Sequence, residues 1–135
     1  MTALDLDPTA AYAWSNLCYL SLLTGNVDRS VIECDRALRH QPALQAARNN
    51  SALSLALSGR LDLALEELLA ADSPADGAFN AGMLYLAVGH YLRAEESFRT
   101  ATVLRPNFGA AETRRRQAAK LAAAGSDTYD HSNRR

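Results

Sequence analysis

Apolar and polar residues follow the period of an α-helix along most of this chain, in stretches that are separated by short turns. Three of the apolar stretches end at a glycine, and a second amphipathic stretch follows each glycine. These glycines, at similar spacings, are Gly25, Gly59 and Gly89. Glycine ends a helix readily because it takes the left-handed backbone conformation without strain. The pattern predicts a helix–turn–helix unit that is used three times.

Other residues recur in the same frame as the glycines. An asparagine stands nine positions before each glycine, a small residue five positions after it and an alanine twelve positions after it, while prolines mark the ends of the units. The recurring residues are Asn16, Asn50 and Asn80; Ser30, Ala64 and Ala94; Ala37, Ala71 and Ala101; and Pro8, Pro42, Pro74 and Pro106. Since neither helix of a unit buries its apolar stripe alone, the units are expected to stack side by side into a solenoid.

Two stretches of the chain have residues that are typical of the signature positions of a known repeat. The first copy has Trp14, Leu17, Ala37 and Pro42, and the third has Gly82, Tyr85, Ala94, Phe98, Ala101 and Pro106. With a period of about 34 residues, this layout resembles the tetratricopeptide repeat (TPR). The resemblance implies an all-α fold, a right-handed α-α superhelix of three TPR hairpins, with units at residues 11–44, 45–74 and 75–108.

The middle unit and the two ends depart from a complete repeat. The middle unit has Arg48 and Ser51 at the signature positions of Trp and Leu, and it is shortened, so its second helix is expected to end near Ala71. Residues 3–8 match the closing turn of a preceding repeat, which predicts a partial repeat at the N-terminus. Residues 109–124 predict a C-terminal capping helix that completes a solenoid over residues 1–124. Residues 125–135 predict a disordered polar tail.

Composition and charge narrow the class of protein. Leu and Ala dominate, 48% of the residues are hydrophobic and 21% are charged, with a formal net charge of -1. A near-neutral chain has no electrostatic reason to bind nucleic acid. The N-terminal residues lack the pattern of a signal peptide, and no apolar run approaches the ~20 residues that cross a bilayer. We therefore expect a cytoplasmic protein that does not insert into membranes.

The chain shows little catalytic chemistry. Its three histidines are scattered, and metal-ligand, phosphate-loop and nucleophile motifs are missing, so we expect no enzyme activity, no metal and no cofactor. The neighbouring carboxylates at 66–67 and 95–96 are interpreted as a solvated outer face. The run of arginines at 114–116 has two interpretations, a solvated capping helix or a basic rim for an acidic partner.

The two cysteines, Cys18 and Cys34, each stand eight residues from Asn26. In an antiparallel hairpin they would lie level with each other, and in the repeat frame they take the positions of a Gly and an aromatic residue. We expect two unpaired thiols that pack as small apolar groups in a reducing compartment. The alternative is a reversible disulfide, because level positions on packed helices meet the distance requirement.

The candidate binding site is a stripe on the first helices of the units, which line the concave groove in the family that the chain resembles. An asparagine amide both donates and accepts, which suits clamping of a peptide backbone, and in peptide-binding members a basic groove residue holds a terminal carboxylate. The candidate groove residues are Tyr12, Asn16, Tyr19, Asn50, Leu53, Asn80, Met83 and Arg114. The alternative for the asparagines is a bond to a neighbouring helix. Asp76 is acidic where chaperone-binding members have a base.

These observations support a non-enzymatic interaction module as the leading hypothesis. It would bind a peptide or partner protein segment in the groove, in a scaffold or adaptor role. The alternatives are a substrate-recruiting arm of a larger enzyme such as a glycosyltransferase, or a bacterial pilus or secretion assembly factor. A third hypothesis is self-association through the N-terminal half-repeat.

Overall fold

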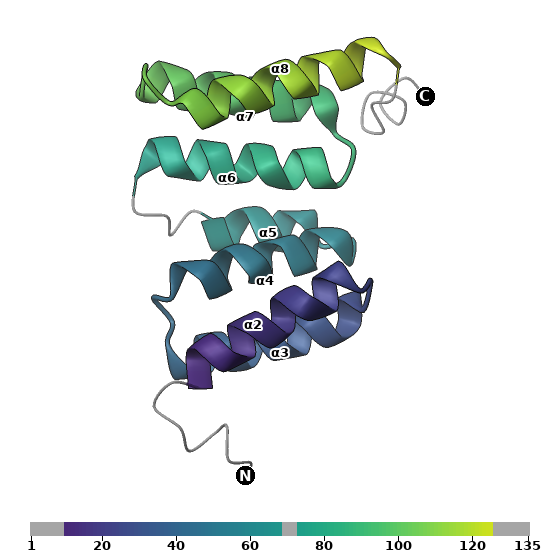
Figure 1. The fold of residues 1–135 in the computed structure, drawn as a ribbon, viewed down its shortest axis with the longest axis vertical. Helices are drawn as coiled ribbons and strands as arrows, with labels where there is room; N and C mark the ends of the chain where they lie inside the picture. The colour runs from purple at the N-terminus through teal and green to yellow at the C-terminus, as the bar shows by residue number, and fades with distance from the viewer. Residues whose placement is uncertain (1–9, 69–72, 126–135) are drawn as a thin grey trace. The chain divides into compact units, whose positions relative to one another are not determined.

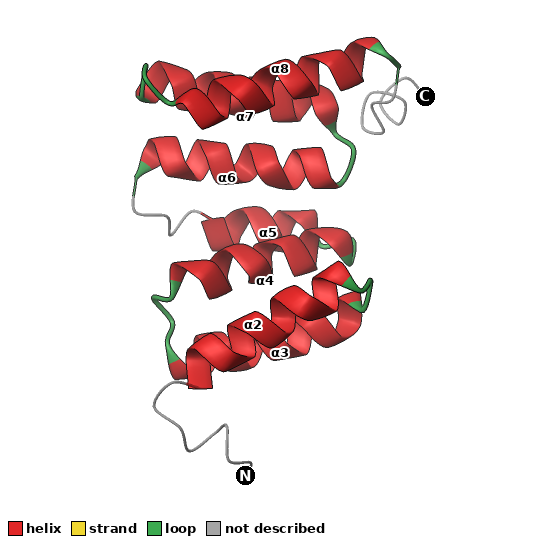
Figure 2. Cartoon of the chain, viewed as in Figure 1, coloured by secondary structure: helices red, strands yellow, loops and turns green. Residues whose placement is uncertain are grey.

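The computed structural model describes residues 10–68 and 73–125 of the chain (Figure 1). Within these ranges it contains seven α-helices and no strand, which confirms the all-α prediction (Figure 2). The chain divides into two compact units, Met1–Leu68 and Leu69–Arg135. The expected N-terminal half-repeat, the end of a helix near Ala71 and the tail from residue 126 lie outside the described residues.

The first unit consists of two helical hairpins. Helices α2 (Ala10–Leu23) and α3 (Val27–His40) form one hairpin, and α4 (Gln45–Leu57) and α5 (Leu61–Leu68) form the next. Helix α4 also packs against both α2 and α3, so the second hairpin rests on the first. The apolar stripes of the two hairpins thus cover each other, as expected for units that cannot bury them alone.

The second unit repeats this plan with three helices. Helices α6 (Pro74–Ala87) and α7 (Tyr91–Leu104) form a hairpin, and α8 (Gly109–Ala123) packs against α7. Ser73 caps the N-terminus of α6, because its hydroxyl accepts a hydrogen bond from the backbone N–H of Asp76 at 3.1 Å. Pro74 follows at the first helical position, where the missing N–H costs nothing.

The predicted glycine turns are confirmed. Gly25, Gly59 and Gly89 have φ angles of 80°, 88° and 83°, in the left-handed region. In each turn the N–H of the following residue bonds back to the helix that has just ended, as Asn26 does to the carbonyl of Ser21 at 2.8 Å. This bond satisfies one of the carbonyls that a helix end leaves without a partner.

Backbone angles repeat between corresponding positions of the α2–α3 and α6–α7 hairpins. The N-cap residues Asn26 and His90 have φ/ψ of -86°/68° and -90°/71°. The C-cap residues Gln41 and Arg105 have -147°/89° and -138°/91°, and each donates its N–H to an alanine carbonyl four positions earlier. Helices α2–α3–α4 and α6–α7–α8 therefore follow the same local plan twice, with different side chains inside.

The cores of the two units contain small residues at fixed positions of the repeat. Ala37 and Ala101, which occupy equivalent positions, are fully buried, and so are Ser30, Ala64 and Ala94 five residues after the turn glycines. In the first unit the small core side chains pack with Trp14 and Leu38, and in the second unit they pack around Phe98. Small residues at these points let the helices approach closely.

Candidate functional site

Cys18 and Cys34 form a disulfide across the α2–α3 hairpin, with their Cα atoms 5.3 Å apart. Both residues are fully buried, so the predicted position inside the hairpin is confirmed. The prediction of two unpaired thiols is wrong, because the two level positions lie within the distance that a disulfide spans. The paired state also removes the support that the cysteines lent to a reducing compartment.

The cysteines occupy a pair of positions that is buried in each of the three hairpins. The first position lies seven residues before the turn glycine and the second lies nine residues after it. The equivalent pairs are Cys18 and Cys34, Ala52 and Leu68, and Gly82 and Phe98, and all six residues are buried. The family frame had placed Cys18 at a glycine position and Cys34 at an aromatic position, and the third hairpin has these two residue types there.

Serine hydroxyls surround the disulfide where α4 meets the first hairpin. Ser30 donates to the hydroxyl of Ser54 at 2.8 Å or to the carbonyl of Val27 at 2.6 Å, and Ser54 donates to the carbonyl of Asn50 at 2.9 Å. The Sγ of Cys18 lies 3.6 Å from the hydroxyl of Ser54. The fully buried hydroxyls are thus hydrogen-bonded, which avoids the cost of burying them unpaired.

Helix α2 exposes a stripe of large side chains, which we call the α2 stripe: Tyr12, Asn16, Tyr19 and Leu23. Their spacing of four, three and four residues places them on one face of the helix. Tyr12 is 55% exposed, Tyr19 is 51% exposed and Leu23 is 65% exposed, and Asn16 is exposed between them. Three large apolar or aromatic side chains are therefore left uncovered around one amide.

Asn50 and Leu53, the groove candidates on α4, are less exposed than the α2 stripe. The Asn50 side chain is half-buried, and its Nδ2 donates to the hydroxyl of Ser15 on α2 at 3.4 Å. This contact matches the alternative in which the asparagine bonds to a neighbouring helix. Its length is beyond the usual range of N–H···O bonds, so the bond is weak.

The second unit holds the remaining three groove candidates. Asn80 is half-buried on α6, and Met83 packs against the core cluster of Ala94, Phe98 and Ala118. On α8, Nη1 of Arg114 donates to Oε1 of Gln117 at 2.9 Å. The candidates thus form one set on α2 and α4 of the first unit and another on α6 and α8 of the second. Part of the Met83 side chain belongs to the core.

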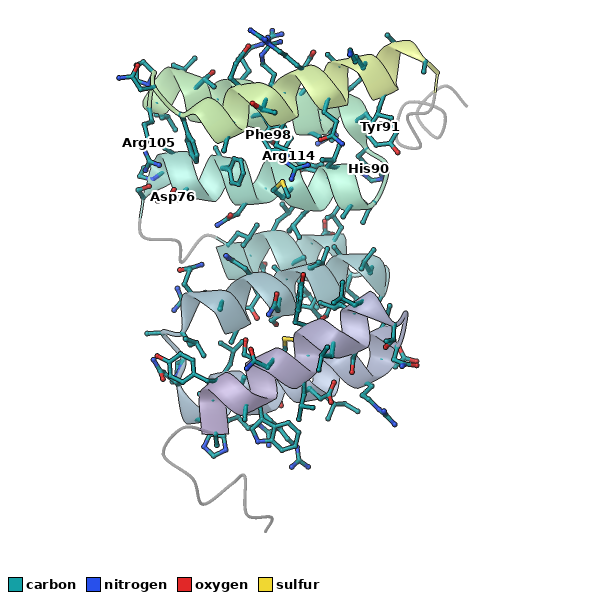
Figure 3. All side chains as sticks on the ribbon, viewed as in Figure 1. Asp76, His90, Tyr91, Phe98, Arg105 and Arg114 are labelled. Carbon is teal, nitrogen blue, oxygen red and sulfur yellow. A yellow bond between two sulfur atoms is a disulfide. The ribbon has the colours of Figure 1, made fainter. Side chains whose placement is uncertain are left out.

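Asp76 joins the start of α6 to the end of α7 (Figure 3). Its two carboxylate oxygens accept from Nη1 and Nη2 of Arg105 at 3.1 and 3.3 Å, and its Oδ2 also accepts from the hydroxyl of Ser73 at 2.8 Å. The hydrogen bonds from Arg105, and then from Ser73, hold the pKa of Asp76 below its ordinary value. Asp76 is acidic where chaperone-binding members of the family that the chain resembles have a base, and in the structure it is paired with Arg105.

Glu112 accepts hydrogen bonds from two arginines of the run at 114–116 on α8. Nε and Nη2 of Arg115 donate to the two oxygens of Glu112 at 3.0 and 2.7 Å, and Nε of Arg116 donates to Oε1 at 3.1 Å. The hydrogen bond from Arg115 is the main cause that lowers the pKa of Glu112 to about 2. With the bond from Arg114 to Gln117, all three guanidinium groups of the run have a partner on their own helix, which favours the capping-helix interpretation.

Glu33 and Glu67 also make contacts between helices that the sequence analysis missed. Glu33 is buried and accepts from the hydroxyl of Ser21, and Glu67 accepts from the hydroxyl of Ser51 at 2.9 Å. Glu67 is half-buried, so its assignment to a solvated face is wrong, whereas Glu66 is exposed. Both bonded glutamates stand eight residues after a turn glycine, a signal that could have identified them.

Residues 10–68 and 73–125 contain no group of three or more His, Cys, Asp or Glu side chains placed to hold a metal ion. Over the same ranges, no helix combines the length and the apolar character that a membrane span requires. No model of a known protein family matches the chain, and no curated protein matches it.

Proposed function

We propose that this chain is a TPR-type protein-interaction module without enzymatic activity, which acts as a scaffold or adaptor. Its ligand is an extended peptide segment of a partner protein. The observation that carries the proposal is the α2 stripe, in which Tyr12, Tyr19 and Leu23 are at least half exposed around Asn16. Large apolar side chains gathered on one exposed face are typical of surfaces that bind another protein.

The chemistry of the stripe suits a peptide in extended form. The Asn16 amide can donate to a peptide carbonyl and accept from a peptide N–H, whatever the side chains of the ligand are. Tyr12 and Tyr19 offer rigid apolar area on both sides of that amide, and each has a hydroxyl for the edge of the contact. From Tyr12 to Leu23 the stripe extends over about 16 Å of helix, which corresponds to about five residues of extended chain.

The two candidates on α4 would extend this surface within the first unit. Asn50 makes a weak bond to Ser15 at 3.4 Å, so its amide can turn to a ligand at little cost. Leu53, one turn further along α4, is half-buried and would add apolar contact. On the second unit, Asn80 and Met83 would have the corresponding roles on α6, and Arg114 would hold a ligand carboxylate.

The superhelical arrangement of the hairpins belongs to the same proposal. Its support is the repetition of the glycine turn at three points with nearly equal φ angles, and the matching cap geometry of the α2–α3 and α6–α7 hairpins. Repeated hairpins of one geometry stack with a constant rotation, which creates the concave surface that solenoid proteins use for binding.

A peptide array tests the proposal. The probe is an immobilised library of unrelated short peptides, and peptides that bind the intact chain are then titrated against variants. The double variant Asn16→Ala, Tyr19→Ala should weaken binding by ~10-fold or more, since truncation of a central aromatic anchor commonly costs about 1 kcal/mol or more. Ile32→Ala is the matched control, because Ile32 is an apolar side chain on α3 that is 60% exposed and lies outside the stripe.

Two results would contradict the proposal. One is an array in which no peptide binds the intact chain. The other is a set of bound peptides whose affinity the stripe variant and the Ile32 control reduce equally. Far-ultraviolet circular dichroism of each variant shows whether the helices remain formed, so a loss of binding is not confused with unfolding.

A further inference from the structure

The Cys18–Cys34 disulfide lies where the equivalent hairpin of the second unit has an aromatic contact. In α6 and α7 these positions hold Gly82 and Phe98, and the Phe98 ring fills the space above the glycine. In α2 and α3 they hold two sulfur atoms joined to each other. At these equivalent positions the α2–α3 hairpin is therefore joined by a covalent bond, and the α6–α7 hairpin is packed by a buried ring.

We propose that this disulfide is a redox-dependent crosslink between α2 and α3 of the first unit, which we call the staple. It replaces the packing that Phe98 provides in the second unit, so a thiol–disulfide couple in the surroundings sets the stability of α2 and α3. The same couple leaves α6 and α7 unchanged, because both cysteines of the chain are in the first unit.

The side chains around the staple explain why its loss matters. Phe98 is the largest fully buried side chain among the described residues, and it has Ala94 and Ala118 for neighbours. At the equivalent point of the first unit the fully buried side chains are the two cysteines with Ser30 and Ser54. Small and hydroxyl-bearing side chains bury less apolar area than a phenyl ring, so packing at this point stabilises the α2–α3 hairpin less than Phe98 stabilises the α6–α7 hairpin.

The loop that the disulfide closes is a second reason why its loss should destabilise the hairpin. The disulfide joins residues with a sequence separation of 16, and it thereby restricts the open hairpin more than the closed one. For a loop of this length the effect corresponds to about a 100-fold change in the equilibrium between closed and open forms. Reduction is expected to make the α2–α3 hairpin open more often by about that factor.

The redox step is a thiol–disulfide exchange with a low-molecular-weight disulfide such as glutathione disulfide. The thiolate of one cysteine attacks the external disulfide and releases one external thiolate, and the second cysteine thiolate then displaces the other from the mixed disulfide. Two cysteine thiols are oxidised and one external disulfide is reduced to two thiols. Because both sulfurs are fully buried, either direction of exchange requires the hairpin to open.

Hydrogen exchange of the full chain, measured by mass spectrometry on peptic fragments, tests the staple. The chain is compared after treatment with glutathione disulfide and after treatment with dithiothreitol. Fragments from α2 and α3 should exchange about 100-fold faster in the reduced chain. Fragments from α6 and α7 serve as the internal control and should not change. Equal exchange in the two states, or equal acceleration in both units, would overturn the proposal.

A variant that copies the second unit separates the staple from a general loss of packing. It carries Cys18→Gly, Ser30→Ala, Cys34→Phe and Ser54→Ala, which are the residues found at the equivalent positions of α6, α7 and α8. This variant should protect α2 and α3 better than the reduced chain does, and dithiothreitol should have no effect on it. A variant with Cys18→Ala and Cys34→Ala should match the reduced chain. If that alanine variant is instead as protected as the oxidised chain, the disulfide is not what holds the hairpin.

Discussion

Gly82 lies against the ring of Phe98 so closely that a Cβ atom built on the glycine would be 2.6 Å from Cε1 of the ring. Only a residue without a side chain fits at this point of α6 while the ring stays in place. The contact joins the two helices of one hairpin, and Phe98 in turn packs against Ala118 of α8. One glycine thus controls how three helices meet.

We therefore expect Gly82→Ala to destabilise the second unit. Overpacking against Phe98 should cost ~2 kcal/mol, which exceeds the ~1 kcal/mol that alanine gains over glycine inside a helix, so the net loss is ~1 kcal/mol. Urea unfolding followed by circular dichroism measures this change. Gly109→Ala is the matched control, because no atom lies within 4 Å of a Cβ built there. An equal response of the two variants would contradict the steric explanation.

The turn glycine Gly25 should resist substitution for a different reason. A Cβ at Gly25 meets no atom within 4 Å, but its φ of 80° is strained for other residues. Gly25→Ala is expected to lower the unfolding free energy by about 1–2 kcal/mol. Gly25→Asn should cost less, since asparagine tolerates the left-handed region better. If alanine proves as stable as asparagine in urea unfolding, backbone strain is not the reason for this glycine.

Ser30 and Ser54 should show energetic coupling, because their hydroxyls bond to each other at 2.8 Å. Each single change to alanine removes one partner of a buried hydrogen bond and should cost about 1 kcal/mol. The double change should cost less than the sum by ~0.5 kcal/mol or more, since either single change already removes the bond between the two hydroxyls. Urea unfolding of the four proteins completes the double-mutant cycle.

The second unit shows that the double change is sterically acceptable, because Ala94 and Ala118 occupy the positions equivalent to these serines and are fully buried. Ser30→Ala combined with Ser73→Ala is the control pair, since Ser73 belongs to the other unit and shares no partner with Ser30. The control effects should add. Additive effects in the Ser30–Ser54 cycle would show that the hydroxyls act independently.

Glu112 should titrate near pH 2, well below its ordinary range, because Arg115 and Arg116 donate to its carboxylate. Its pKa is lower in the folded chain than in the unfolded chain. Any stability from these bonds is thus complete above the ordinary pKa of 4.5 and is lost as the pH falls from there toward about 2. Carbon-13 NMR of the carboxyl group measures the titration. Arg115→Gln should raise the pKa more than Arg116→Gln does, and the reverse order would contradict the assigned geometry.

The local structure of this protein was readable from the sequence. A glycine needs no tertiary partner to end a helix, so Gly25, Gly59 and Gly89 marked the turns at positions where the structure has positive φ. The apolar period likewise predicted which helix faces would be buried, and the small residue five positions after each glycine is fully buried in all three hairpins. These signals are local, and they were sufficient for the all-α class and for the places where the described helices turn.

Only the tertiary structure decided what pairs across the helices. Level positions for Cys18 and Cys34 were predicted, but whether two thiols bond depends on a separation that the spacing in the sequence leaves open, here 5.3 Å between Cα atoms. The same is true of Asn50, whose amide meets Ser15 on another helix, and of Glu67, which meets Ser51. The sequence determined where the helices turn because those signals act within a few residues. The partners of buried polar groups depend on how helices approach each other, and contacts between residues far apart in the sequence set that approach.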